Sequence, residues 1–189
     1  MMTMKDRDLS EGLAKRGRPD IAFHVLLQAL GSPLNREGLL RTCIHTVDDN
    51  VIDIDPSLRP PRNYDRFIGI LEQLYDQKSL PPGERPLLSI RQCTLPTLAD
   101  ENAASMTVAF STLGKPASMK DACSSLVRAR APVVLIGGFA RSHFKQSTSQ
   151  LADHIFSVDK EPLDAWVVAA RLVYEYECGI GLPERRLRA

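Results

Sequence analysis

The chain has 189 residues, of which 43% are hydrophobic, and its 24 basic and 23 acidic side chains nearly cancel. This length and composition are typical of one soluble domain, and they exclude net charge as the cause of any nucleic-acid binding, which must come from local clusters. No apolar run approaches the length of a membrane span, and the polar N-terminus lacks the apolar core of a signal peptide. We therefore expect a cytoplasmic protein.

The cysteines and histidines form no recognisable metal or disulfide pattern. There is no CxxC pair and no HExxH motif, so we expect no metal and predict that the cysteines are small core residues in a reducing compartment. His24 lies among apolar residues, which favours a packed helix residue over a ligand.

The N-terminal half begins with a polar, basic stretch at residues 1–17, which we interpret as a tail. An apolar helix follows, with Asp20 predicted as its N-cap and Gly31 as its stop. Because this helix is apolar on nearly all sides, we expect it to be buried. The segment SPLNREG is predicted to be a turn. The alternating runs LLRTCIHT and VIDI, joined through residues 48–50, predict a β-hairpin.

The next segment, residues 55–63, holds three prolines and two arginines and is predicted to be an extended loop before a helix at 64–77. Further elements are predicted as a loop at 79–86, a strand at 87–91, a helix at 95–102, a strand at 106–111, a helix from Ser118 to Arg130, strands at 133–136 and 154–158, and a helix that begins near Pro162. This alternation predicts an α/β fold with a mostly parallel sheet and helices on both faces.

The strand at 133–136 ends in the pair Gly137 and Gly138, which lets the main chain approach a ligand closely and leaves its amides free. The strand at 154–158 likewise ends in a polar loop. We therefore expect the carboxyl ends of both strands to face one pocket. A Gly-Gly turn alone is a weak signal, because about half of such turns after buried strands need no ligand.

Longer strings of residues carry a family resemblance. GGFAR, followed by SVDKEPLDAWVVAAR, resembles the cofactor-binding end of the SPOUT-class RNA methyltransferases. With RPDIAFHVLLQAL, GSPLNREGLL and RPPRNYDRFIGILEQL, the chain most resembles the ribosome-biogenesis enzymes that methylate the N-1 nitrogen of a pseudouridine in small-subunit rRNA. The resemblance implies one SPOUT domain over residues 1–189, with a C-terminal trefoil knot and an inserted β-hairpin. It also implies a homodimer whose final helix region contributes to the interface near the cofactor.

The same resemblance implies that S-adenosylmethionine is held by the loops at 112–115, 137–142 and 156–163. The residues assigned to the cofactor are Leu113, Gly114, Gly137, Gly138, Ser142, Phe156, Ser157, Val158, Asp159, Lys160, Glu161 and Leu163. For Leu113, Val158 and Leu163, plain core packing is an equally good interpretation of the residues alone.

Arg59, Arg62 and Arg66 lie at spacings of three and four across a loop-to-helix junction and can point the same way to bind phosphates. Taken alone, such a cluster is more often a solvated surface. In the family, however, arginines matching these three and Arg18 bind the RNA, and the acid matching Asp20 orients them. We also expect Asp20 to offset the mutual repulsion of the three arginines.

Two features depart from the family pattern. Many relatives place a carboxylate directly before Ser-Pro, where this chain has Gly31. Either the proton of the pseudouridine N–H is taken up by Asp20, our candidate catalytic residue, by an ordered water or by the RNA itself, or the protein has weak activity. Relatives also carry a strand and a helix upstream of the RPD string, whereas 17 residues precede Arg18 here, so we expect the first strand of the sheet to be absent.

The sequence thus predicts a dimeric, S-adenosylmethionine-dependent methyltransferase of pseudouridine in small-subunit rRNA, with a role in ribosome biogenesis. An alternative is a non-catalytic ribosome-assembly factor that binds pre-rRNA through the same arginines. A third hypothesis is a SPOUT enzyme that acts on another RNA.

Overall fold

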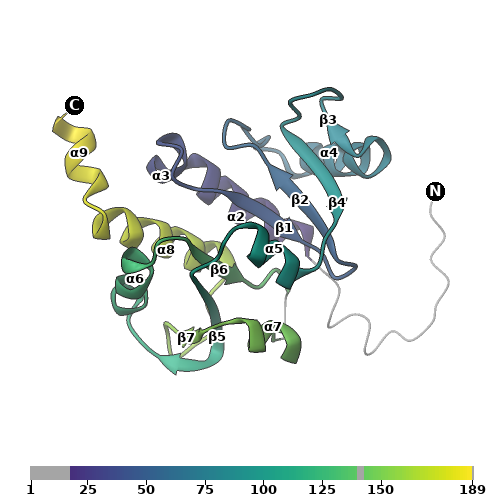
Figure 1. Ribbon diagram of the computed structural model, residues 1–189. Coiled ribbons are helices and arrows are strands. Elements are labelled where there is room, and N and C mark those ends of the chain that lie inside the picture. Colours follow the sequence, from purple (N-terminus) through teal and green to yellow (C-terminus); the bar gives the residue numbers. More distant parts are fainter. Residues whose placement is uncertain (1–17, 140–142, 189) are drawn as a thin grey trace.

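The computed structural model describes residues 18–139 and 143–188, and its strands form two separate sheets (Figure 1). The first sheet is antiparallel, in the order β1 (Thr42–His45), β2 (Asn50–Ile54), β4 (Leu88–Gln92) and β3 (Ser79–Leu80). The second sheet is parallel, in the order β6 (Pro132–Ile136), β5 (Met106–Pro116) and β7 (His154–Ser157). The molecule is therefore an α/β protein that contains a parallel sheet and helices.

Helices cover both sheets and join them. They are α2 (Pro19–Gly31), α3 (Pro33–Arg36), α4 (Tyr64–Gln77), α5 (Leu95–Glu101), α6 (Met119–Arg128), α7 (Gln146–Leu151), α8 (Ala165–Gly179) and α9 (Leu182–Arg188). Helix α8 contacts both α2 and α6, so it connects the two halves of the molecule (Figure 1).

The antiparallel sheet packs one face against α2 and α4. Along β2, Ile52 and Ile54 are buried while Asp53 between them is turned away from this core. The opposite face is partly covered as well, because Val51 is fully buried there against Cys93 and Leu98 of α5. From the helices, Phe23 and Phe67 pack against the same core, which explains the apolar faces that the sequence shows at 21–30 and 67–74.

The parallel sheet has its own core. Val108 and Phe110 of β5 pack against α6 and α8, where Leu126 and Val168 are among the buried partners. Ala109, between them in β5, faces the other way and is also fully buried, so both sides of this central strand are covered. Strand β6 lies at the edge of the sheet within the described residues and is half-buried along its length, whereas the sequence predicted a buried strand.

The segment SPLNREG contains a short helix, α3, and the turn predicted there is wrong. The Ser32 side chain accepts a hydrogen bond from the Asn35 amide at 3.1 Å, and Pro33 occupies the first helical position. The helix is also fixed from a distance, because buried Glu177 of α8 accepts a hydrogen bond from the Leu34 amide at 2.8 Å. These contacts attach the end of α2 to α8.

Other predictions need correction. The strand predicted at 87–91 does not join the parallel sheet: β4 pairs antiparallel with β2, so four of the seven strands in the described residues lie outside the parallel sheet. The alternation of buried Leu88 and Ile90 with polar neighbours agrees with this placement. Asp20 lies in the first turn of α2 and not at its N-cap, which is Arg18, and Cys178 is exposed and not part of a core.

The boundaries of α4, the hairpin of β1 and β2, and the Ser118 cap of α6 are confirmed. Within the part of the chain that the structure describes, no helix combines the length and apolar character of a membrane span. In the same residues, no group of three or more His, Cys, Asp or Glu side chains is placed to hold a metal ion.

Candidate functional site

The carboxyl ends of the three parallel strands meet at one edge of their sheet. Phe110 of β5 is in register with Ile136 of β6 on one side and with Phe156 of β7 on the other. After an irregularity, β5 returns to β7, where Lys115 lies opposite Phe156. The segments at 112–115, 137–139 and 156–163 therefore lie at neighbouring strand ends. The loop predicted at 112–115 is wrong, because β5 continues past the strand predicted at 106–111 and pairs with β7 as far as Pro116.

Gly114 brings two of these segments into close contact. A Cβ atom at this position would lie 2.6 Å from the carbonyl carbon of Phe156 and 2.7 Å from the carbonyl group of Ile155. These are main-chain atoms and cannot rotate away, so only glycine fits here. The Gly114 main chain thus lies directly on the end of β7.

The glycine pair at the end of β6 leaves open space. Among the residues that the structure describes, a Cβ atom on Gly138 would meet nothing within 4 Å, whereas one on Gly137 would meet the Phe139 ring at 2.5 Å. The carbonyl oxygen of Gly138 accepts a hydrogen bond from the Arg18 amide at 3.1 Å. The RPD string therefore begins at the glycine turn.

The loop after β7 is held by its own hydrogen bonds. The Ser157 hydroxyl donates to the carbonyl oxygen of Asp159 at 3.0 Å, and the Glu161 amide donates to the Asp159 carboxylate at 3.1 Å. Lys160 is exposed and forms a 3.8 Å ion pair with Glu161. This part of the loop is therefore ordered by short-range contacts and presents its main chain at the same edge as Gly138.

The apolar residues assigned to the cofactor differ in their surroundings. Phe156, Val158 and Leu163 are half-buried and pack against the core formed by β5, α6 and α8. Leu113 is 73% exposed, so core packing does not explain this residue. Ser142, the remaining residue assigned to the cofactor, lies outside the described residues.

Arg18 and Asp20 form a two-point ion pair. The Arg18 Nε donates to Asp20 Oδ1 at 2.7 Å, and a second guanidinium nitrogen bonds the other carboxylate oxygen. The hydrogen bonds from Arg18 hold the pKa of Asp20 below its ordinary value, although partial burial opposes the shift. A carboxylate with a lowered pKa is a weaker base. The geometry therefore suits an orienting role for Asp20 better than proton uptake.

Arg59, Arg62 and Arg66 are all exposed around the start of α4. Arg59 Nη1 bonds three carbonyl oxygens of its own loop, at 3.2–3.4 Å. Within residues 18–139 and 143–188, none of the three arginines is in an ion pair. The expectation that Asp20 offsets their repulsion is wrong, because Asp20 is bound to Arg18.

Aromatic rings connect the start of α2 with α4 and α8, which sequence patterns did not reveal. The Tyr64 ring contacts Phe23 edge-on, with centroids 5.7 Å apart, and His24 contacts Trp166 at 5.0 Å. His24 is exposed, so the prediction of a packed residue is wrong in its burial. Its ring nevertheless contacts the ring of Phe23. The alternation of an aromatic residue with arginines in RPPRNYDRF was the available signal for Tyr64.

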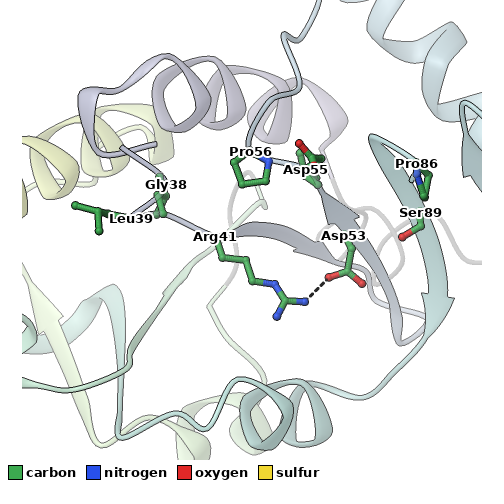
Figure 2. A pocket seen from close by; sticks show the side chains of 10 residues that line it. Gly38, Leu39, Arg41, Asp53, Asp55, Pro56, Pro86 and Ser89 are labelled. Atoms are coloured by element: carbon green, nitrogen blue, oxygen red, sulfur yellow. Dashed lines mark hydrogen bonds and ion pairs between the residues drawn. The ribbon is translucent and has the colours of Figure 1, made fainter. Parts of the chain in front are cut away.

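An open hollow of about 670 Å³ lies elsewhere, against β2 and the loop after α3 (Figure 2). Arg41 at its margin bonds Asp53 at 2.9 Å, and Asp53 also bonds Arg91 at 3.0 Å. None of the residues assigned to cofactor or RNA lines this hollow. Its charged side chains are largely neutralised by one another, so we do not assign the candidate site to it.

Comparisons with known proteins agree with the geometry. A family model described as EMG1/NEP1 methyltransferase matches residues 3–177. The chain is similar to the ribosomal RNA small subunit methyltransferase Nep1 of Pyrococcus furiosus, with 37% identity over 171 residues that cover 90% of this chain and 74% of the relative. Nep1 of Thermococcus kodakarensis is 34% identical over 168 residues, which cover 89% of this chain and 74% of the relative.

The fold is also similar to a solved structure, the crystal structure of Archaeoglobus fulgidus Nep1 bound to S-adenosylhomocysteine. The TM-score is 0.75 at 27% sequence identity, and the match covers 89% of this chain and 74% of the other. Since the family model covers most of the chain and relatives exceed 30% identity, the chain belongs to the EMG1/NEP1 methyltransferase family.

Proposed function

We propose that this protein is an S-adenosylmethionine-dependent methyltransferase that methylates the N-1 nitrogen of a pseudouridine in small-subunit rRNA during ribosome biogenesis. The observation that carries the proposal is the hydrogen bond from the Arg18 amide to the Gly138 carbonyl oxygen, 3.1 Å long. It joins the start of the predicted RNA-binding motif to the predicted cofactor turn. The names of the relatives, and the S-adenosylhomocysteine bound to the structural neighbour, support the same function.

The residues at the edge of the parallel sheet fit S-adenosylmethionine. Among the described residues, the space beside Gly138 admits a ligand next to the main chain, and Gly114 holds the last part of β5 against the end of β7. Exposed Leu113 is available to cover an adenine ring. When bound, the cofactor supplies a methyl group on a sulfonium, so the protein must align the acceptor and exclude water.

On the RNA side, Arg62 and Arg66 supply guanidinium groups for phosphates, and Arg18 is oriented by Asp20. The N-1 proton of pseudouridine must leave during the reaction. Because the ion pair with Arg18 lowers the pKa of Asp20, we assign this carboxylate to orientation and the proton to water or the RNA.

The proposal includes the further features that the family resemblance implies. These are a single domain with a C-terminal trefoil knot and an inserted hairpin, a homodimer with the final helix region at its interface, and a location in the cytoplasm. The motif resemblance supports the domain, the knot, the hairpin and the homodimer, and the cytoplasmic location rests on the sequence expectation alone.

The test is methyl transfer from labelled S-adenosylmethionine to two RNA hairpins that differ only in pseudouridine or uridine at one position. We expect label in the pseudouridine hairpin alone. Equal rates on both would contradict the pseudouridine assignment and favour a SPOUT enzyme for another RNA. Binding of the hairpin without any transfer would instead favour the non-catalytic assembly factor.

A further inference from the structure

Tyr64 is a partly exposed aromatic residue in the middle of the predicted RNA-binding arginines. It is the first residue of α4, with Arg62 two positions before it and Arg66 two positions after it. The residue is 37% exposed although its aromatic ring is large and mostly apolar. The neighbouring Asn63 side chain accepts a hydrogen bond from the Arg66 amide at 3.0 Å, which fixes the backbone that carries the ring.

The inner side of the Tyr64 ring rests on a rigid support. Its centroid lies 5.7 Å from that of Phe23, and the ring planes meet at 61°. Phe23 is only 3% exposed and itself packs on Phe67 at 5.2 Å. An edge-to-face contact covers at most one face of either ring. In the described residues Phe23 is the only aromatic partner of Tyr64, and the residue keeps 37% of its surface exposed, so part of the tyrosine is open to a ligand.

Exposed arginines flank Tyr64 in the sequence, and the acidic Asp65 directly follows it. Arg62 and Arg66 are exposed next to it along the chain. The pKa of Arg18 is raised chiefly by its hydrogen bonds to Asp20, and the charge of Tyr64 adds a smaller shift in the same direction. Phosphates bound by such arginines would bring the attached bases over the tyrosine.

We propose that Tyr64 is the stacking platform for an unpaired base of the RNA bound at these arginines. The inference rests on the proposed RNA-binding function and deepens it, because it names the chemistry of the substrate segment: single-stranded RNA with a base turned out of its stack. Proteins hold such bases on aromatic rings, and stacking tolerates all four bases because each has a π-face. A paired duplex offers no base to this ring.

The experiment compares affinities for a fluorescently labelled RNA hairpin with an unpaired loop and for a fully paired duplex of equal length. Tyr64→Ala removes the ring on which one base would stack. It should therefore weaken hairpin binding by about five- to a hundredfold and leave duplex binding unchanged. Tyr64→Phe should restore the affinity, and Tyr64→Leu, which keeps the bulk against Phe23, should not. Tyr75→Ala is the matched control, because Tyr75 is 44% exposed on the same helix but distant from the arginines in sequence.

The outcomes separate the inference from the proposed function. If the unaltered protein and Tyr75→Ala bind the hairpin and Tyr64→Leu binds it equally well, the stacking role is wrong while RNA binding stands. If the unaltered, folded protein binds neither RNA, the proposed function itself fails. If Tyr64→Ala does not fold, the dissociation constants of Tyr64→Leu and Tyr64→Phe for the hairpin are compared instead. Equal values for these two variants would overturn the inference.

Discussion

The ion pair of Arg18 and Asp20 is the residue-scale feature with the clearest pH dependence. Because Arg18 lowers the folded-state pKa of Asp20, the pair stabilises the fold above the ordinary carboxyl value of 3.8, and this contribution is lost as the pH falls through the lowered value. We predict that Asp20→Asn lowers the melting temperature slightly at neutral pH and not at strongly acidic pH. Melting curves of both proteins across this range check it, and a gap that widens in acid would contradict it.

A second residue-scale prediction concerns Arg62 and Arg66. Replacing either by alanine should weaken RNA binding and leave the affinity for S-adenosylmethionine unchanged. The reason is that Arg62 lies just before α4 and Arg66 in its first turn, whereas the predicted cofactor residues lie at the carboxyl ends of β5, β6 and β7. The slope of the logarithm of RNA affinity against the logarithm of salt concentration should decrease by about one, which corresponds to the loss of one phosphate contact. Arg85→Ala, at an exposed arginine of another loop, serves as the control. Comparable loss of both affinities would show the assignment wrong.

At the scale of elements, the contact between the end of β5 and β7 depends on Gly114. Gly114→Ala places a Cβ atom 2.6 Å from main chain, so we predict a loss of unfolding free energy of about 1–3 kcal/mol together with weaker cofactor binding. Gly31→Ala is the matched control, since its Cβ would meet nothing within 4 Å. Denaturant titration of both variants measures the difference. Equal stabilities would mean that the two chains are not held this closely.

The attachment of α3 to α8 is a second element-scale feature. Glu177→Ala leaves the buried Leu34 amide without its acceptor, and a buried donor without a partner costs about 1–3 kcal/mol of stability. Glu177→Gln keeps an oxygen acceptor and should lose less. Unfolding free energies of the two variants test this, and an alanine variant as stable as the glutamine variant would refute the role of the hydrogen bond.

The elements also show what the sequence could predict. Helix α4 was predicted at its observed boundaries because its signals are local: an Asn63 cap and a single apolar face. Helix α3 was missed because the acceptor for its Leu34 amide lies 143 residues away. The pairing of β4 with β2 is equally non-local, so the sequence revealed the strand but not its sheet.

At the scale of the whole molecule, the candidate site arises where the two halves meet. The residues predicted that the ends of the strands at 133–136 and 154–158 face one pocket, and the family resemblance added the segment at 112–115. Parallel pairing to a common strand, β5, explains why these segments share one edge. The sequence did not predict the hydrogen bond from the Arg18 amide to the Gly138 carbonyl oxygen, because no local pattern links residues so far apart in the chain. Nor did it predict the aromatic contact from Tyr64 to Phe23, which depends on how α4 packs on α2.

The account depends above all on the claim that the segments at the carboxyl ends of β5, β6 and β7 form a binding site for S-adenosylmethionine. Isothermal titration of the folded full chain with S-adenosylmethionine tests this most directly. We predict saturable binding at one site per chain, weakened in Gly114→Ala and unchanged in Arg62→Ala. A flat titration of the folded protein would contradict the claim and remove the methyltransferase assignment.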